Sequence, residues 1–217
     1  TTTVPSATTT VPSATTTVAP STTTVAATTT TSTTTTTTTI ALTCATGGAC
    51  VVGDAGPGGG IIFYDAGSIQ SWGRYLEVAC VSWQNNCVGT TADPQAVWGC
   101  QGTLIAGADG TAIGTGEQNT TDIVNGCVTS DITAAELAAG YSHNTLDDWF
   151  LPSEDELNQM YTNLHSASTP LGGFLADVYW SSSEEDDIWV RLQFFNTGSL
   201  GSSLKAAVFY VRPVRAF

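Results

Sequence analysis

Six cysteines are the residues of this 217-residue chain whose spacing predicts chemistry most directly. An even number of cysteines beside a threonine-rich tract is typical of disulfides in an oxidising compartment, and no Cys-x-x-Cys pair indicates a metal or redox site. Short separations favour one bridge across the Gly47-Gly48 turn and a second around a short polar loop. Other connectivities stay open at this point. The favoured pairs are Cys44 with Cys50, Cys80 with Cys87, and Cys100 with Cys127.

The second group of reactive residues is a series of hydroxyls, because 23 of the first 39 residues are threonine. Threonine and serine interspersed with proline and alanine are typical of O-glycosylated stalks, in which the hydroxyls carry the glycans. A flexible linker without glycans is the alternative. The candidate glycosylation residues are Thr1, Thr2, Thr3, Ser6, Thr8, Thr9, Thr10, Ser13, Thr15, Thr16, Thr17, Thr22, Thr23, Thr24, Thr28, Thr29, Thr30, Thr33, Thr34 and Thr35.

The remaining ionisable side chains match no catalytic or metal-binding motif. The acidic run from Glu184 to Asp187 could supply oxygen ligands to calcium, but it lacks the spacing of a calcium loop, which favours a solvated hairpin turn. His143 and His165 belong to neither an H-x-x-x-H nor an H-E-x-x-H pattern, and no G-x-S-x-G occurs. We therefore expect a protein without enzymatic activity, metal or cofactor.

Three further features have a structural and a functional interpretation. The acidic residues 154–156 suit the start of a helix better than they suit catalysis. Asn119-Thr120-Thr121 matches the N-glycosylation motif, which has many false positives. Tryptophans could form a sugar-stacking platform, although most are expected in the core because an indole buries a large area. These tryptophans are Trp72, Trp83, Trp98, Trp149, Trp180 and Trp189.

Composition divides the chain into a stalk, residues 1–43, and a globular domain, residues 44–217. The stalk contains no charged residue, glycine or aromatic residue, so it cannot bury a core of its own. The second region holds all 22 glycines and every tryptophan, which is enough chain for one domain. The predicted fold class is α+β: a mixed domain with an antiparallel sheet and a few short helices, preceded by an extended, non-globular segment.

The stalk repeats the heptad Thr-Thr-Thr-Val-Pro-Ser-Ala at residues 1–7 and 8–14, and its proline excludes a coiled coil. Extended or polyproline II geometry would give it a reach of about 120–130 Å, or about three diameters of a roughly 40 Å domain. Residues 39–43 alternate polar and apolar side chains, which predicts an entry strand in the same domain or strand addition to another copy. Ile40 and Leu42 are the candidate subunit contacts.

Turn and capping signals predict the elements of the domain. Glycines 58–60 indicate a turn before a strand, and three capping boxes predict helices that begin at Thr115, Thr133 and Ser153. The first helix is expected to end near Gly126 and the second at Gly140. Apolar and β-branched runs predict strands over residues 61–64, 74–81, 178–180, 188–195 and 206–214.

Six motifs in this domain occur together and carry a resemblance to a known family. They are Gly53-Asp54-x-Gly56-Pro57-Gly58-Gly59-Gly60-Ile61, Trp98-Gly99-Cys100, Gly107-Ala108-Asp109-Gly110-Thr111-Ala112-Ile113-Gly114, Asp148-Trp149-Phe150-Leu151-Pro152-Ser153-x-x-Glu156-Leu157, Tyr179-Trp180-Ser181-Ser182-Ser183-Glu184 and Val211-Arg212-Pro213-Val214-Arg215.

Residues 51–217 resemble, through these motifs, the Lcl C-terminal domain family of bacterial surface proteins. The resemblance implies a C-type-lectin-like fold, distantly similar to the formylglycine-generating enzymes, and an adhesin in which a repetitive stalk presents the domain to glycosaminoglycans. A net charge of −14 suits a polyanionic ligand poorly, and the stalk lacks the periodic glycine of collagen. The distant enzymes need reactive cysteines late in the domain, whereas no cysteine follows Cys127.

Charge and hydropathy restrict the partners. The negative charge disfavours nucleic acid and anionic lipid, and no run of about 18 apolar residues predicts a membrane span. The chain starts at Thr1 without methionine, which indicates a removed signal peptide or a piece of a longer protein. We expect an extracellular or cell-surface protein: a structural subunit of an O-glycosylated filament whose partners are covalent glycans and other copies of itself. A carbohydrate-binding adhesin is the alternative.

Overall fold

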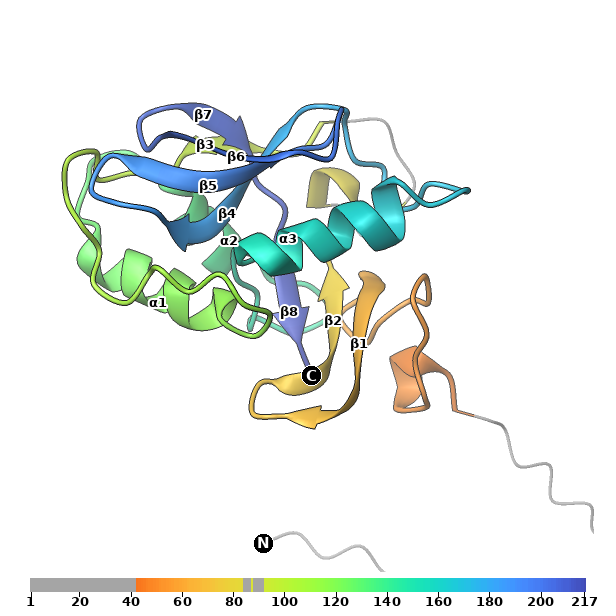
Figure 1. Ribbon diagram of the computed structural model, residues 1–217. Coiled ribbons are helices and arrows are strands. Elements are labelled where there is room, and N and C mark those ends of the chain that lie inside the picture. Colours follow the sequence, from red (N-terminus) through yellow and green to blue (C-terminus); the bar gives the residue numbers. More distant parts are fainter. Residues whose placement is uncertain (1–41, 84–86, 88–91) are drawn as a thin grey trace, which may run out of the picture. The chain divides into compact units, whose positions relative to one another are not determined.

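The computed structural model describes residues 42–83, 87 and 92–217, all within one compact unit, Ile40–Phe217. The candidate glycosylation residues, the subunit contact Ile40 and the part of the polar loop between Cys80 and Cys87 that follows residue 83 lie outside the described residues. The described part is an α+β domain, with a three-stranded sheet, a five-stranded sheet and short helices (Figure 1).

The three-stranded sheet is antiparallel, in the order β1-β2-β8. A hairpin forms its first two strands, β1 (Ile61–Gln70) and β2 (Gly73–Val78), and β8 (Val214–Ala216) adds the end of the chain to β2. The first three residues of β1 are buried, whereas its last four are exposed. The strand therefore extends six residues beyond the apolar run that predicted it, and its far end forms a hairpin tip in water (Figure 1).

The five-stranded sheet has the order β3-β7-β4-β5-β6. Its strands β4 (Val178–Glu184), β5 (Trp189–Phe194) and β6 (Leu200–Leu204) form an antiparallel meander, and β3 (Gln95–Val97) pairs antiparallel with β7 (Val208–Tyr210). The sequence predicted an antiparallel sheet. Because β7 runs parallel to β4, this sheet is mixed.

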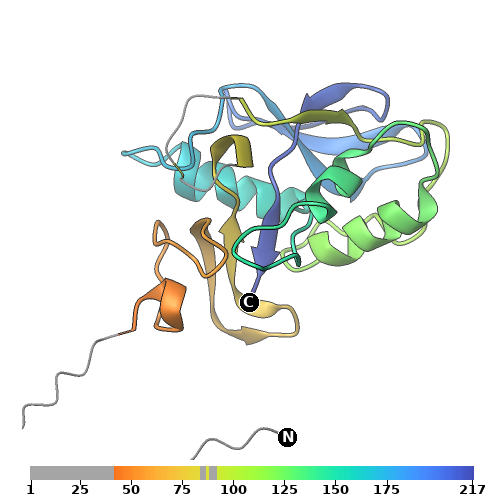
Figure 2. The same cartoon turned by 180° about the vertical axis from the view of Figure 1, so that it is seen from behind.

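The single strand expected over residues 206–214 is wrong. The segment divides between β7 and β8, which belong to different sheets, and Pro213, which cannot donate to a ladder, lies between them. The chain therefore passes from one sheet to the other here, as the rear view shows (Figure 2).

Three α-helices occur in the described part: α1 (Gly116–Gly126), α2 (Ala134–Ala139) and α3 (Glu154–Met160), which continues as a π-helical turn, Tyr161–His165. The capping boxes at Thr133 and Ser153 are present. The box predicted at Thr115 does not form, because the Thr115 hydroxyl donates instead to the carbonyl of Ala112 at 2.7 Å.

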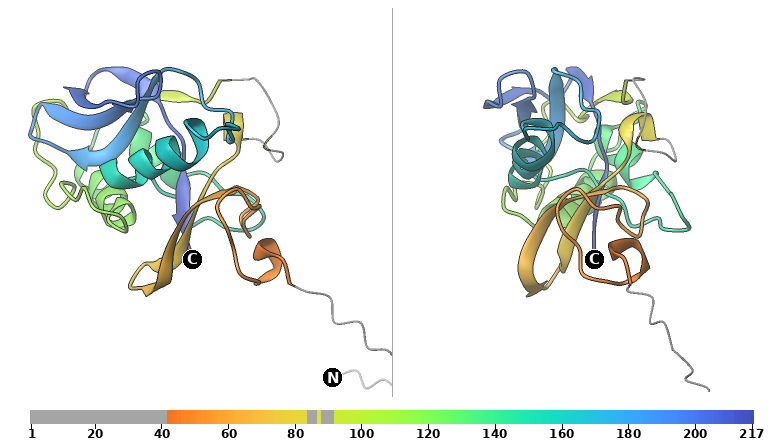
Figure 3. Two further views of the ribbon diagram at one scale, coloured as in Figure 1. Left: turned by 45° about the vertical axis from the view of Figure 1, so that its right-hand side comes forward. Right: turned by 90° about the vertical axis from the view of Figure 1, so that its right-hand side faces the viewer.

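Helix α3 contacts strands of both sheets, β4 and β5 on one side and β1 on the other (Figure 3). Its apolar face is Leu157, Met160 and Leu164, all fully buried. One core cluster surrounds Trp98 and Trp180 between the five-stranded sheet and the helices α1 and α2, and a second lies beneath α3. The second cluster includes the aromatic rings of Phe63, Phe150, Phe174, Tyr179 and Phe195.

Three disulfides brace the described domain, and they are the three predicted pairs, two of which the spacing favoured. Cys44–Cys50 closes the segment by which the chain enters the domain, Cys80–Cys87 follows β2, and Cys100–Cys127 joins the loop after β3 to the end of α1. Disulfides of this number fit a secreted or extracellular protein. Within residues 42–83, 87 and 92–217, no helix has the length and apolar character needed to cross a membrane.

Candidate functional site

The tryptophans divide into core and surface residues. Trp98, Trp149 and Trp180 are buried, while Trp72 and Trp83 are half-buried. Trp189, at the start of β5, is 42% exposed. A flat, open platform of several indoles is therefore not formed by these six side chains.

The acidic run differs from the predicted hairpin turn at its first residue. Glu184 is 2% exposed, accepts the backbone N–H of Ile105 and forms an ion pair with Lys205, which is itself fully buried. Asp186 does serve the turn, because it accepts the N–H groups of Trp189 and Ile188, and these bonds lower the pKa of its carboxyl. In the described part of the chain, no group of histidine, cysteine and acidic side chains is placed to hold a metal ion.

The histidines and the glycosylation motif belong to the packing of the domain. The ring of His143 stacks on Tyr141, and the ring of His165 packs edge-on against Phe174. Asn119 is 1% exposed, and its amide donates to the carbonyl of Gly110 at 2.6 Å. The folded domain therefore hides the asparagine that N-glycosylation would require.

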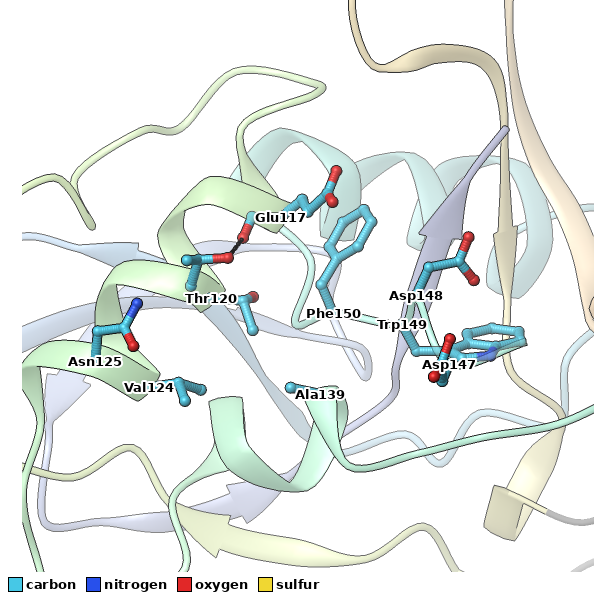
Figure 4. A pocket seen from close by; sticks show the side chains of 10 residues that line it. Glu117, Thr120, Val124, Asn125, Ala139, Asp147, Asp148, Trp149 and Phe150 are labelled. Carbon is cyan, nitrogen blue, oxygen red and sulfur yellow. Dashed lines mark hydrogen bonds between the residues drawn. The ribbon is translucent and has the colours of Figure 1, made fainter. Parts of the chain in front are cut away.

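An acidic pocket of about 270 Å³ opens where α1 faces the segment 147–150 (Figure 4). We use this name for the cavity between Glu117 and Asn125 of α1 and the pair Asp147-Asp148. Its apolar wall is formed by Val124, Ala139, Trp149 and Phe150.

The position of Asp148 in this pocket is fixed from β8. Arg215 donates through Nε and Nη2 to the two oxygens of Asp148, at 2.7 and 2.6 Å, and through Nη1 to Glu77 at 2.8 Å. The guanidinium lowers the pKa of the Asp148 carboxyl, whereas burial raises the pKa of Glu77. The pocket thus presents an oriented carboxylate whose charge is compensated by Arg215, together with Glu117 and Asp147, whose charges are not compensated by an ion pair within the described residues and disfavour anions.

A second concavity, the apolar groove, has a volume of about 390 Å³. It lies between the entry segment, the tip of the β1–β2 hairpin and residue Phe217, and its lining is Cys44, Gly47, Gly48, Pro57, Ile69, Gly73, Arg74, Tyr75 and Phe217.

Aromatic rings form one wall of the apolar groove. The rings of Tyr75 and Phe217 lie 5.6 Å apart, and the guanidinium of Arg74 lies 4.8 Å from the centre of the Tyr75 ring. A side chain on Gly73 would meet the Phe217 carbonyl at 2.8 Å, so only glycine permits this close approach. At the rim, Ile69 is 85% exposed, which leaves a large apolar side chain without a partner inside the described domain.

Several buried ionic groups lie away from both concavities. Arg212 donates to Asp93 at 2.8 Å, and Asp93 also accepts the hydroxyl of Tyr179. Glu156 accepts the N–H groups of Gly114 and Ser153, at 2.7 and 2.8 Å, and its complete burial raises the pKa of its carboxyl to about 7. Glu156 is therefore a capping group, as predicted for the acidic residues of this helix. The Arg212–Asp93 pair holds loops to the core.

Several residues of the two concavities occur in sequence patterns, although none of these patterns predicted a cavity. Asp148, Trp149, Phe150 and Pro57 occur in motifs of the family resemblance, Thr120 and Thr121 in the N-glycosylation motif, and Cys44, Gly47 and Gly48 in the predicted bridge and turn. The exposed Ile69, at the end of a strand that was expected to stop at Tyr64, had no signal in the sequence. Leu42, the candidate subunit contact within the described residues, is exposed and lies beside Gly48 of the apolar groove, where a side chain would overlap its carbonyl.

Comparison with known proteins identifies no relatives for this chain: no protein-family model matches it, and no curated protein is similar to it in sequence.

Proposed function

We propose that this protein is a structural subunit of an extracellular, O-glycosylated filament in which the threonine-rich stalk of one copy bridges to neighbouring copies. The observation that carries the proposal is the direct attachment of a 39-residue, uncharged, threonine-rich segment to a disulfide-closed entry into the domain. A fixed attachment of this kind allows a stalk to transmit load within a polymer.

The entry segment is held at several points. Thr43 and Thr46 form a reciprocal cap, Gly48 donates its N–H to Thr43 at 2.7 Å, and the Cys44–Cys50 bridge closes the loop. Both cysteines are buried against Tyr75 of β2. A force on the stalk would therefore reach the three-stranded sheet through covalent and hydrogen bonds within a few residues.

The positions of the motif residues in the domain support a structural role for the residues that carry the family resemblance. Trp98, Trp180, Glu156 and Arg212 are all buried and either pack in the core or bond to it. These positions support a role of the motifs in the fold, for which we propose the C-type-lectin-like type. Location at a cell surface, with covalent glycans on the stalk, completes this proposal.

Electron microscopy of the purified protein, combined with glycopeptide mapping of residues 1–39, tests the proposed function. The expected result is uniform filaments with glycans on the hydroxyls of the stalk. A uniformly monomeric preparation with unmodified threonines would contradict it.

Carbohydrate binding at the acidic pocket is the second candidate function. Its volume of about 270 Å³ and its combination of carboxylates, an amide and an aromatic wall suit one neutral or amino sugar. Its negative charge disfavours glycosaminoglycans. Binding on a glycan array that is lost in Asp147→Asn and kept in the distant surface variant Asp187→Asn would support this function; no binding by the unmodified protein would contradict it.

A further inference from the structure

We propose that the apolar groove is the docking site for a Val-Pro pair of the stalk of a second copy of this chain. The inference rests on the proposed function, because it names the surface on which a bridging stalk would bind. It is carried by the chemistry of the groove, by the sequence of the segment that precedes Leu42, and by the place where that segment joins the domain.

The groove has the features that recognise proline in an extended peptide. Proline-containing segments in polyproline II geometry dock in grooves lined by aromatic side chains, because their conformation is preformed and loses little entropy on binding. Tyr75 and Phe217 pack against each other with their ring centres 5.6 Å apart, and Tyr75 is 9% exposed, so most of the apolar surface open to a proline comes from Phe217, Pro57 and Ile69. The backbone ladder between Tyr75 and Phe217, with N–H to carbonyl distances of 2.9 and 3.1 Å, keeps the two rings in place.

The stalk contains a matching sequence in each intact repeat. Val4-Pro5-Ser6-Ala7 and Val11-Pro12-Ser13-Ala14 are four-residue intervals without threonine, and each contains one candidate glycosylation residue, Ser6 or Ser13. In polyproline II geometry, with about three residues per turn, a docked Val-Pro pair directs the following serine away from the groove. The stalk is uncharged, so its approach to an acidic domain meets no charge repulsion.

The length of the stalk favours the groove of a second copy over the groove of the same copy. A stalk that returned to its own domain would need a reversal, and no glycine, proline, asparagine or aspartate occurs in residues 21–41. If the chain reversed its direction at Pro20, Val4 would lie about six residues, or about 19 Å, short of the point where the stalk joins the domain. The extended stalk reaches about 120–130 Å, which is enough to pass neighbouring copies.

Photo-crosslinking of the full chain tests this docking directly. The photo-reactive residue p-benzoylphenylalanine replaces Ala7, next to an intact Val-Pro pair, and heavy-isotope-labelled copies are mixed with unlabelled copies before assembly. We expect crosslinks between labelled and unlabelled copies in the peptides that contain Ile69, Tyr75 or Phe217. Crosslinks confined to other surfaces, or confined to copies of the same isotope, would overturn the inference.

One substitution and its matched control test the groove, and a double substitution tests the stalk. Ile69→Asp should weaken the association between copies about tenfold or more, because it removes an apolar side chain that docking would bury. Val128→Asp adds the same charge at a side chain that is 91% exposed outside the groove, and should leave association unchanged. Pro5→Thr combined with Pro12→Thr alters only the stalk and should weaken association as Ile69→Asp does. Equal association of Ile69→Asp and the unmodified chain would overturn the inference.

Electron microscopy of the same samples separates the two proposals. Filaments whose crosslinks avoid the groove, or that form equally well with Ile69→Asp, would overturn the docking site and leave the filament function standing. Monomers without crosslinks between copies would overturn both. Crosslinks in the groove between copies that form no filament would retain the docking site and overturn the filament.

Discussion

The only lysine of the chain, Lys205, is fully buried, with its Nζ against Glu184 and the carbonyl of Thr103, and 4.9 Å from the centre of the Trp98 ring. Removing one partner of such a pair leaves an uncompensated charge in the interior. We predict that Lys205→Met lowers the free energy of unfolding by about 3–5 kcal/mol, measured by urea denaturation.

A second substitution distinguishes the stranded charge from simple loss of packing. Lys205→Met combined with Glu184→Gln removes both charges, and the glutamine carbonyl still accepts the N–H of Ile105. This double variant should be more stable than Lys205→Met alone, and an equal or lower stability would contradict the explanation. Arg74→Gln serves as the control, because Arg74 pairs with Asp65 at the surface, where water screens the charges.

Glu156 makes a separate prediction about pH. Burial raises the pKa of its carboxyl from 4.5 in the unfolded chain to about 7 in the folded domain, so the folded state binds more protons between these values. Its contribution to stability is complete below about pH 4.5 and is lost as pH rises through about 7. We predict that the free energy of unfolding falls by about 2 kcal/mol more in the unmodified protein than in Glu156→Gln between pH 5 and pH 7.5.

Urea denaturation of both proteins at the two pH values measures this difference. Asp148, whose pKa is lowered by Arg215, contributes in the opposite sense, because its stabilisation is present above its unfolded pKa and disappears as pH falls through the folded value. The pH range in which Asp148 titrates lies below pH 5, so it does not overlap with the range from pH 5 to pH 7.5 used for Glu156. The same pH dependence in Glu156→Gln and the unmodified protein would show that another group titrates.

Among the elements, the disulfides are expected to stabilise the domain in proportion to the loops they close. Cys100–Cys127 spans 27 residues and includes α1, whereas Cys44–Cys50 spans 6. Chain entropy then predicts a loss of about 3.5 kcal/mol when both cysteines of the first pair become serine, and about 2 kcal/mol for the second. Denaturation of the two double variants tests this order. A larger loss of stability for Cys44–Cys50 would show that this bridge stabilises the domain by more than its effect on chain entropy.

Local signals predicted the helices better than the strands. The boxes at Thr133 and Ser153 form because each side chain meets the N–H three residues ahead, while Thr115 has a helical backbone conformation that turns its hydroxyl toward Ala112. Strand β6, Leu200–Leu204, was missed because its interior residues are glycine and serine, and it forms through pairing with β5. Such pairing is a property of the neighbouring strand and leaves no pattern in the segment itself.

The two concavities were beyond sequence reasoning for a related reason. The apolar groove joins residue 44, the hairpin near residue 70 and Phe217, and only the β2–β8 ladder brings Phe217 next to Tyr75. The acidic pocket likewise needs α1 to face residues 147–150. Two disulfide pairs differ because their partners lie 6 and 7 residues apart, so a short loop brings them together, and Cys100 with Cys127 was the pair that remained.

The charge of the whole chain bears on how copies associate. Its formal net charge is −14, and all five basic residues are already paired with carboxylates: Arg74, Arg191, Lys205, Arg212 and Arg215. Three of them are buried in the domain. Contacts between domains therefore bring together surfaces of like charge, and the attraction between copies must come from apolar and neutral groups.

This balance predicts that salt strengthens self-association. The screening length falls from about 30 Å at 0.01 M salt to about 8 Å at 0.15 M, so repulsion between domains weakens while the contact of a neutral stalk with an apolar groove is retained. Sedimentation velocity should show association at least severalfold stronger at the higher salt concentration. Asp131→Asn combined with Asp187→Asn, both at exposed positions, should associate more tightly than the unmodified chain in low salt and equally in high salt. Association that weakens with salt would instead require attractive ion pairs between copies, and the paired state of every basic residue in the domain argues against them.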